Sequence, residues 1–167
     1  MPTVLDPPLN ALGLAATGAV VERQYPIGGF ARLADRLADA SGSAQVRLEL
    51  ALFDGTPVGR LELRAPVSLI CQRCLGPLRR ELVSESRLAF VAGDDAEVPA
   101  EYEAVAGDAR RIDLAALVED ELLLSLPLIV QHAPEEDCSP QGAVAESRPV
   151  APEMRRPFAG LKDLLKH

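Results

Sequence analysis

The chain has 167 residues, 48% of them hydrophobic but only 4% aromatic, and acidic residues outnumber basic ones to give a net charge of −8. Such a chain repels phosphate as a whole and lacks the stacking surfaces of single-strand nucleic-acid binders. Three cysteines argue against a disulfide framework, the opening residues lack the pattern of a secretory signal, and no apolar run reaches the roughly 20 residues of a membrane span. We therefore expect one cytoplasmic domain with tails.

The N-terminal part of the sequence predicts an arm followed by a helix. Residues 1–29 hold four prolines and four glycines, which indicates an irregular arm packed on the domain, with a strand near Ala19–Arg23. Apolar residues at helical spacing predict a short helix over Phe30–Ala40, and Ser41 and Gly42 end that pattern.

The central residues predict consecutive strands. Apolar and charged residues alternate over Val46–Leu52, and a turn at Asp54–Pro57 leads into a second strand over Val58–Leu63, with Gly59 as a candidate bulge. Further strands are predicted over Val67–Cys71 and from Leu78 to Val91, and a short one over Tyr102–Val105. Strands that follow one another so closely favour an antiparallel meander.

A helix is predicted after the strands, from Asp113 to the breaker Pro127, because Asp113 suits an N-cap and apolar residues follow at helical spacing. The whole pattern predicts an α+β core domain over residues 30–138: an antiparallel β-sheet, a meander and partly barrel-like, with a few short helices. Residues 139–167 predict a flexible tail, and its last ten residues, from Phe158, regain an amphipathic pattern suited to docking.

Four residues form a candidate metal site. Cys71 and Cys74 have the C-x-x-C spacing with which a tight turn brings two thiolates onto one tetrahedral ion, and His132 and Cys138 would complete the set. Such a site has no position left for water, so it would be a structural zinc site. Metal-free reduced thiols and a redox dithiol are the alternatives, although the motif does not open a helix as in thioredoxin-like proteins.

Charged residues on either side of this site are candidate contacts for a partner protein or RNA. Six arginines and three glutamates lie between Arg60 and Arg87, and Arg73, Arg79 and Arg80 are the candidates nearest the cysteines. The alternative is that these arginines pair with acids of the same chain.

The acidic candidates are Glu119, Asp120 and Glu121 in the predicted helix. Neighbouring helical residues point about 100° apart, so the three carboxylates do not converge on one ion. They indicate a solvated face or a face turned to a basic partner. No nucleophile with a base, phosphate-binding loop or dinucleotide motif is found, which favours a non-enzymatic protein without a small-molecule substrate.

Several segments resemble the YceD-like family, the large ribosomal RNA subunit accumulation proteins. They are Cys71-Gln-Arg-Cys-Leu-Gly-Pro-Leu, Glu101-Tyr-Glu-Ala-Val, the block from Ile112 through Glu-Asp-Glu-Leu-Leu-Leu-Ser-Leu-Pro-Leu, His132 followed by Cys138, and Pro157-Phe-Ala-Gly-Leu. The resemblance runs in order from about Cys71 onward, and the block at the predicted helix is its most specific part.

The resemblance implies a bacterial or organellar factor that supports synthesis, processing or stability of 23S ribosomal RNA, and thus assembly of the large subunit. It implies no catalytic residue and no ligand set, so zinc rests on the spacing alone. We expect a partner that is a ribosomal or RNA-processing protein, with 23S RNA precursor as a further partner. The rival hypothesis is a thiol- or metal-dependent enzyme, such as a nuclease, that uses Cys71, Cys74 and His132.

Overall fold

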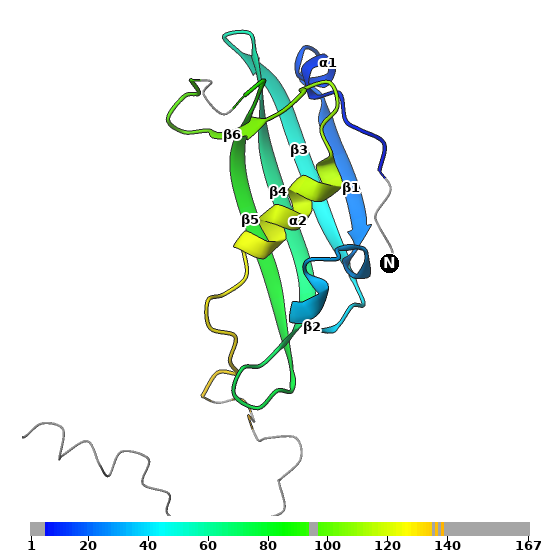
Figure 1. Ribbon diagram of the computed structural model, residues 1–167, viewed down its shortest axis with the longest axis vertical. Coiled ribbons are helices and arrows are strands. Elements are labelled where there is room, and N and C mark those ends of the chain that lie inside the picture. Colours follow the sequence, from blue (N-terminus) through cyan, green and yellow to red (C-terminus); the bar gives the residue numbers. More distant parts are fainter. Residues whose placement is uncertain (1–5, 94–96, 135, 137, 139–167) are drawn as a thin grey trace, which may run out of the picture.

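The computed structural model describes residues 6–93, 97–134, 136 and 138 (Figure 1). Its centre is a six-stranded sheet in the order β1-β3-β4-β5-β6, with the short β2 also paired to β4. Helix α2 lies across one face of this sheet, and α1 packs near one end of it. The elements are α1 (Ala11–Ala15), β1 (Val20–Pro26), β2 (Leu37–Asp39), β3 (Ser43–Phe53), β4 (Thr56–Ile70), β5 (Pro77–Val91), β6 (Glu103–Ala106) and α2 (Leu114–Leu124).

The predicted hairpin between β3 and β4 is confirmed. Its two-residue turn holds Asp54 at φ 47° and Gly55 at φ 81°, and Phe53 pairs with Thr56 on either side of it. Two positive φ angles mark a type I′ turn, whose twist matches that of the flanking strands. Gly59 is not a bulge, because it pairs in register with Leu50 and a Cβ atom there would come within 2.8 Å of another leucine side chain.

Strands β4 and β5 form a long hairpin that extends past β3. The sequence predicted separate strands over Val58–Leu63 and Val67–Cys71, but both belong to β4, one strand of 15 residues. Its pairing with β3 runs from Thr56 to Arg64, while β2 pairs with it at Ser68 and Leu69. Pro66 lies between these two ladders, where its missing N–H removes no ladder bond. The far end of the β4–β5 hairpin therefore projects beyond the rest of the sheet and carries the turn Cys71–Gly76.

The α+β class is confirmed, with two corrections to the sheet. Strand β6 pairs with the end of β5 in parallel, from Leu88–Glu103 to Val91–Ala106, so the sheet is mixed. The eleven residues between β5 and β6 let the chain turn back before it pairs. The sheet is also open, since its strand order runs from β1 to β6 without closure, and the expected partial barrel is not formed.

One N-terminal prediction is wrong and another is incomplete. The stretch Phe30–Ala40 is not a helix, because a 3-10 turn over Ala34–Arg36 leads into β2, whose Leu37 pairs with Leu69. Sheet pairing here outweighs local helical spacing. Residues 1–29 are also not simply irregular: they contribute α1 and β1, and the predicted strand there is confirmed and longer. The predicted tail, residues 139–167, lies outside the described residues.

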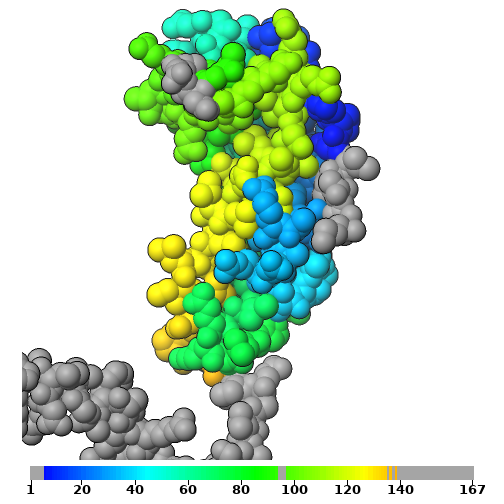
Figure 2. Space-filling view, in the orientation of Figure 1, coloured from blue at the N-terminus to red at the C-terminus, as the bar shows by residue number. Residues whose placement is uncertain are grey.

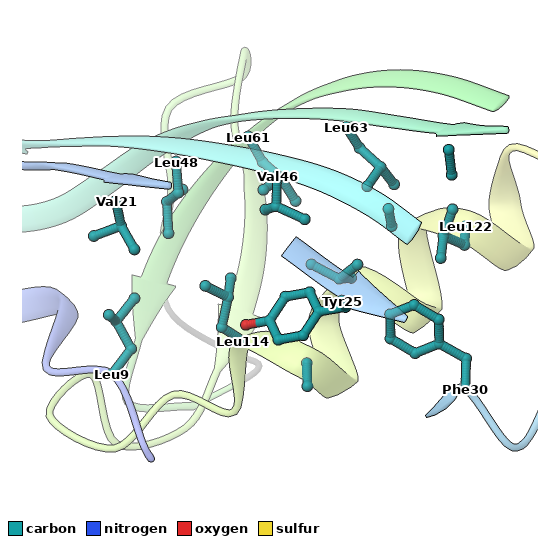
Figure 3. Close-up of a cluster of buried hydrophobic side chains, with 14 of the residues drawn as sticks. Leu9, Val21, Tyr25, Phe30, Val46, Leu48, Leu61, Leu63, Leu114 and Leu122 are labelled. Atoms are coloured by element: carbon teal, nitrogen blue, oxygen red, sulfur yellow. The ribbon is translucent and has the colours of Figure 1, made fainter. Parts of the chain in front are cut away.

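The hydrophobic core lies between the sheet and α2 (Figure 3). Alternate residues of β1, β3 and β4 point to the same face, for example Val21, Leu48 and Leu61, which occupy neighbouring strands. Leu114 and Leu122 of α2 close this layer from the other side and are fully buried. Among the described residues, no helix is both long enough and apolar enough to cross a bilayer.

The other face of the sheet is polar. Arg47 pairs with Glu22 and Glu49 on this face, and Arg60 pairs with Glu62 and Glu85. Neighbouring strands thus carry opposite charges side by side, as expected of a solvent-facing sheet surface.

Candidate metal centre

The turn at the projecting end of the β4–β5 hairpin places Cys71 and Cys74 together. The N–H of Leu75 donates to the carbonyl of Cys71 (2.9 Å), and the N–H of Cys71 donates to the carbonyl of Gly76 (2.9 Å). Leu75 has a φ of 59°, an uncommon value for this residue type, which tightens the turn. Both cysteines are buried.

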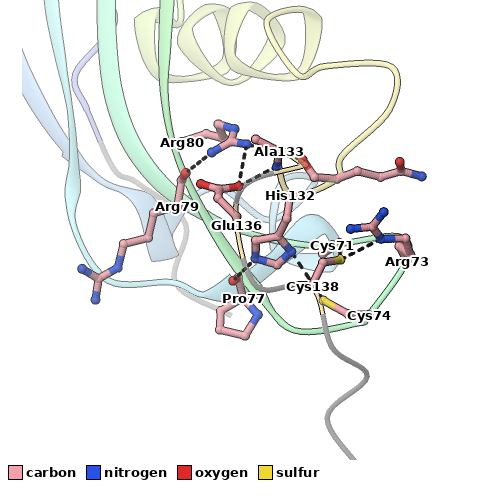
Figure 4. A network of polar contacts seen from close by, with 11 residues as sticks. Cys71, Arg73, Cys74, Pro77, Arg79, Arg80, His132, Ala133, Glu136 and Cys138 are labelled. Atoms are coloured by element: carbon pink, nitrogen blue, oxygen red, sulfur yellow. Dashed lines mark hydrogen bonds and ion pairs between the residues drawn. The ribbon is translucent and has the colours of Figure 1, made fainter.

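The segment after α2 brings His132 and Cys138 to the same place (Figure 4). It is attached to the hairpin by a hydrogen bond from the Gln72 N–H to the carbonyl of Val130 (2.8 Å). Arg80 of β5 pairs with Glu136 (3.5 Å), whose carboxylate also accepts a hydrogen bond from the Ala133 N–H (2.7 Å). These contacts define a 130–138 segment that folds back over the hairpin end.

The four predicted ligands converge. One ligand atom each from Cys71, Cys74, His132 and Cys138 lies within 4.8 Å of all the others. The sulfur atoms of Cys71 and Cys138 are 3.7 Å apart, and Nδ1 of His132 lies 3.5 Å from the sulfur of Cys74. Cys71 and Cys74 are 58 to 67 positions away from His132 and Cys138 in the sequence. The four residues nevertheless form one compact cluster, which could hold a metal ion.

The hydrogen bonds of His132 select the nitrogen that faces the cluster. Nε2 lies 3.2 Å from the carbonyl oxygen of Pro77, which only accepts hydrogen bonds. Nε2 therefore carries a proton, and Nδ1, which faces the cysteines, is the nitrogen available to a metal once it is deprotonated. A ring nitrogen fixed in this way by a backbone carbonyl is the usual arrangement of a metal-binding histidine.

The surroundings favour ionised sulfur at two of the three cysteines. Burial opposes ionisation of Cys71, but the backbone N–H groups of Cys74, Arg73 and His132 outweigh it and lower the pKa of Cys71 to about 5. Burial likewise opposes ionisation of Cys138, and hydrogen bonds from Arg73 and His132 lower its pKa. Thiolates are the form that binds metal.

Cys74 and His132 shift in the opposite direction. The Gly76 N–H favours the Cys74 thiolate, but burial and the neighbouring sulfurs together raise the Cys74 pKa. Hydrogen bonds to Cys138 and Cys71 raise the pKa of His132. Without a metal, Cys74 and His132 therefore tend to keep their protons, and metal binding has to release them.

Groups around the cluster support its sulfur atoms. Nε of Arg73 donates to the sulfur of Cys138 (2.9 Å), and the N–H of Gly76 donates to that of Cys74 (3.4 Å). Three thiolates and a divalent cation would leave a net charge of −1, which the Arg73 guanidinium offsets.

The three arginines predicted to contact a partner lie in different places. Arg73 and Arg80 hold the Cys/His cluster and the 130–138 segment together, whereas Arg79 is exposed on the opposite face of the sheet.

The acidic candidates of α2 also have partners within the chain. Glu119 and Asp120 both bind Arg32, whose Nε lies 3.0 Å from Glu119 Oε2 and whose Nη1 lies 2.5 Å from Asp120 Oδ1. Sequence reasoning missed Arg32 because it was expected on a helix with no assigned partner.

Glu121 is buried, which contradicts the prediction that it faces a partner. Only 6% of Glu121 is exposed, and its carboxylate accepts hydrogen bonds from the hydroxyls of Ser84 (3.0 Å) and Ser86 (2.7 Å) on β5. The two serines occupy alternate positions on the inner face of β5, between the buried Leu82 and Leu88, and this pattern was the sequence signal for the contact.

Comparison with known proteins gives a family. The family described as "Large ribosomal RNA subunit accumulation protein YceD" matches residues 59–165. A protein of that name from Haemophilus influenzae is 33% identical over 115 residues, an alignment that covers 66% of this chain and 66% of the relative. No solved structure matches the chain. The matched residues include all four members of the Cys/His cluster and the whole of α2, and the chain belongs to the YceD family.

Proposed function

We propose that the chain is a non-catalytic factor that supports accumulation of 23S ribosomal RNA by binding a ribosomal or RNA-processing protein. The family, and the name of the Haemophilus relative, support a role in large ribosomal RNA accumulation. The partner and the way in which the chain acts are our inference, from the site and from the distribution of charge.

The proposal that the chain is non-catalytic rests on the closed set of four ligands. A tetrahedral zinc ion with Zn–S of about 2.3 Å and Zn–N of about 2.0 Å places two sulfurs about 3.8 Å apart and a sulfur and nitrogen about 3.5 Å apart. The Cys71–Cys138 and Cys74–His132 separations, 3.7 Å and 3.5 Å, agree with this geometry, and all four ligand atoms lie within 4.8 Å of one another. Three thiolates and one imidazole fill the tetrahedron, so the ion would hold the 130–138 segment on the hairpin and leave no position for a substrate.

The charges favour a protein partner over RNA. Five arginines and five glutamates lie on the polar face of the sheet, so this face presents no basic surface to phosphate: Arg47, Arg60, Arg64, Arg79, Arg87, Glu22, Glu49, Glu62, Glu81 and Glu85. Residues 1–138 contain 12 basic and 22 acidic residues, or −10. An acidic body suits a basic protein, because complementary charge speeds association and excludes wrong partners.

The test compares Cys74→Ser with Gln72→Ala in a bacterium that lacks its own member of the family. The Gln72 side chain is exposed in the same turn, so Gln72→Ala is the matched control. We expect the control to restore the ratio of 23S to 16S RNA and to retain one zinc ion per chain, and Cys74→Ser to lose both. Zinc-free wild-type protein that is fully active would overturn the structural-metal part of the proposal.

Two further measurements test whether the partner is a protein and whether the chain degrades RNA. Partners recovered with the tagged full chain should survive ribonuclease treatment, and loss of all of them would indicate RNA binding instead. Purified protein should not degrade 23S precursor RNA. Degradation that Cys74→Ser abolishes would replace our proposal with the nuclease hypothesis.

A further inference from the structure

A groove of about 470 Å³ with mostly apolar walls lies next to the Cys/His cluster, and Asp35, Arg36 and Gln72 add polar groups to its lining. One wall comes from the hairpin end, with Ile70 and Leu75, and the other from α2 and the residues after it, with Leu123, Leu126, Leu128 and Val130. These segments lie together on the face seen in Figure 2, where the end of the yellow α2 region approaches the green hairpin end.

Large apolar side chains are exposed in the groove and beside it in the sequence. Of the lining residues, Leu128 is 98% exposed and Leu75 76%, and Leu124 and Ile129, which adjoin lining residues in the sequence, are 77% and 67% exposed. Single exposed leucines are ordinary, but a contiguous group around a groove marks a binding surface. Leu75 and Leu128 come from segments more than 50 residues apart, so the fold itself brings the group together.

The last ten residues of the chain itself are close enough in sequence to reach this groove. Cys138 lies at the cluster that borders the groove, and 29 residues follow it in the sequence. The 19 residues from Ser139 to Pro157 reach about 60 Å when extended, and about 25 Å on average as a flexible linker. Residues 158–167 can therefore return to the groove without strain, and their tether gives an effective concentration in the millimolar range.

The composition of residues 158–167 fits an apolar groove on an acidic body. At 100° per residue, Phe158, Leu161, Leu164 and Leu165 fall within an arc of about 120°. Lys162, Asp163 and Lys166 fall on the opposite side. Residues 139–167 carry five basic and three acidic residues, or +2, against −10 for the rest of the chain. The family match also extends through the segment, to residue 165.

We propose that residues 158–165 of this chain bind in the groove beside the metal centre as an amphipathic helix, with the apolar arc against Leu75 and Leu128. The bound segment covers the apolar rim, and a partner that uses the same surface has to displace it. The segment, the groove and the metal centre thus form one connected unit at the projecting end of the hairpin.

The test is photo-cross-linking within the purified full chain. Leu128 is replaced by p-benzoylphenylalanine, and the products are mapped by mass spectrometry on an equal mixture of ¹⁴N and ¹⁵N protein. We expect cross-links to residues 158–165 within single chains. The same photoreactive residue in place of Phe53, exposed at the opposite end of the sheet, should give none.

Two matched variants test the apolar arc. Leu161→Asp with Leu165→Asp should lower the cross-link yield at least tenfold. Ala143→Asp with Ala145→Asp adds the same charge in the linker and should leave the yield unchanged. Cross-links between ¹⁴N and ¹⁵N chains would indicate docking of a second copy and would overturn the proposal, as would cross-links elsewhere or none at all. The assay contains no ribosomal RNA, so its outcome is independent of the proposed function.

Discussion

The β4–β5 hairpin is stabilised in different ways along its length. Its central part lies in a cluster of 25 buried residues between the sheet and α2. Its projecting end contains a separate cluster of three, Cys71, Cys74 and Leu78. The two strands are continuous, yet β3 and α2 cover the central part, whereas Val130 and Cys138 of the 130–138 segment pack against the three-residue cluster.

The difference shows which part of the hairpin cannot be stabilised by apolar burial alone. Burial contributes roughly 25 cal/mol per Å² of apolar surface, so a large cluster stabilises the centre of the sheet while three side chains contribute little. Small folding units that cannot bury enough apolar surface commonly depend on metals or disulfides. The Cys/His cluster occupies the region where this limitation applies.

If zinc occupies the Cys/His cluster, as we propose, its removal should produce the largest change, because structural zinc contributes on the order of 10 kcal/mol or more in zinc-finger peptides. We expect a chelator, or Cys138→Ser, to abolish amide protection in Cys71–Gly76 and around Val130 while protection in β3 is retained. Hydrogen exchange with mass spectrometry measures both regions in one sample. Equal loss of protection in β3 would show that the two parts are not independent.

Leu122→Ala should destabilise the centre of the sheet and leave the Cys/His cluster unchanged. Leu122 is fully buried between α2 and the sheet, and such truncations cost about 2–5 kcal/mol. The free energy of unfolding by urea should fall by that amount, while the zinc content stays at that of the wild type. Leu124→Ala is the control on the same helix, because Leu124 is 77% exposed and its loss should change stability little.

Glu121→Leu tests the polar contact within the apolar layer. The substitution leaves the hydroxyls of Ser84 and Ser86 without their acceptor, at a cost of about 1–3 kcal/mol. Adding Ser84→Ala and Ser86→Ala should recover most of this loss, because both sides of the contact are then apolar. A triple variant no more stable than Glu121→Leu would show that the carboxylate acts through some other contact.

The parts of the fold that could be predicted from sequence are those with local signals. Alternation identified β3, the Asp54–Gly55 turn has one common conformation, and Asp113 begins α2 as an N-cap. The C-x-x-C spacing likewise pointed to a turn that brings two thiols together. Each of these features depends on residues within a few positions of one another.

The features that could not be predicted depend on distant residues. Phe30–Ala40 has helical spacing, but pairing of Leu37 with Leu69 decides its structure. The contact of Arg32 with Glu119 joins residues 87 positions apart, and no local pattern indicates it. The parallel direction of β6 could not be predicted either, because the length of the connection between β5 and β6 does not determine the direction in which the chain returns.

Asp113→Ala should have the smallest effect of the four changes. The carboxylate of Asp113 accepts a hydrogen bond from the N–H of Ala116 (2.9 Å), and loss of such a cap costs about 1 kcal/mol. Because the first turn of α2 lies on the large core and far from the cysteines, the free energy of unfolding should fall by that amount with no change in zinc content. Asp113→Ser retains a capping oxygen and should be close to wild type in urea unfolding. If Asp113→Ala instead loosened the 130–138 segment, the metal centre would depend on the position of the whole helix, and the two parts of the hairpin would be coupled through α2.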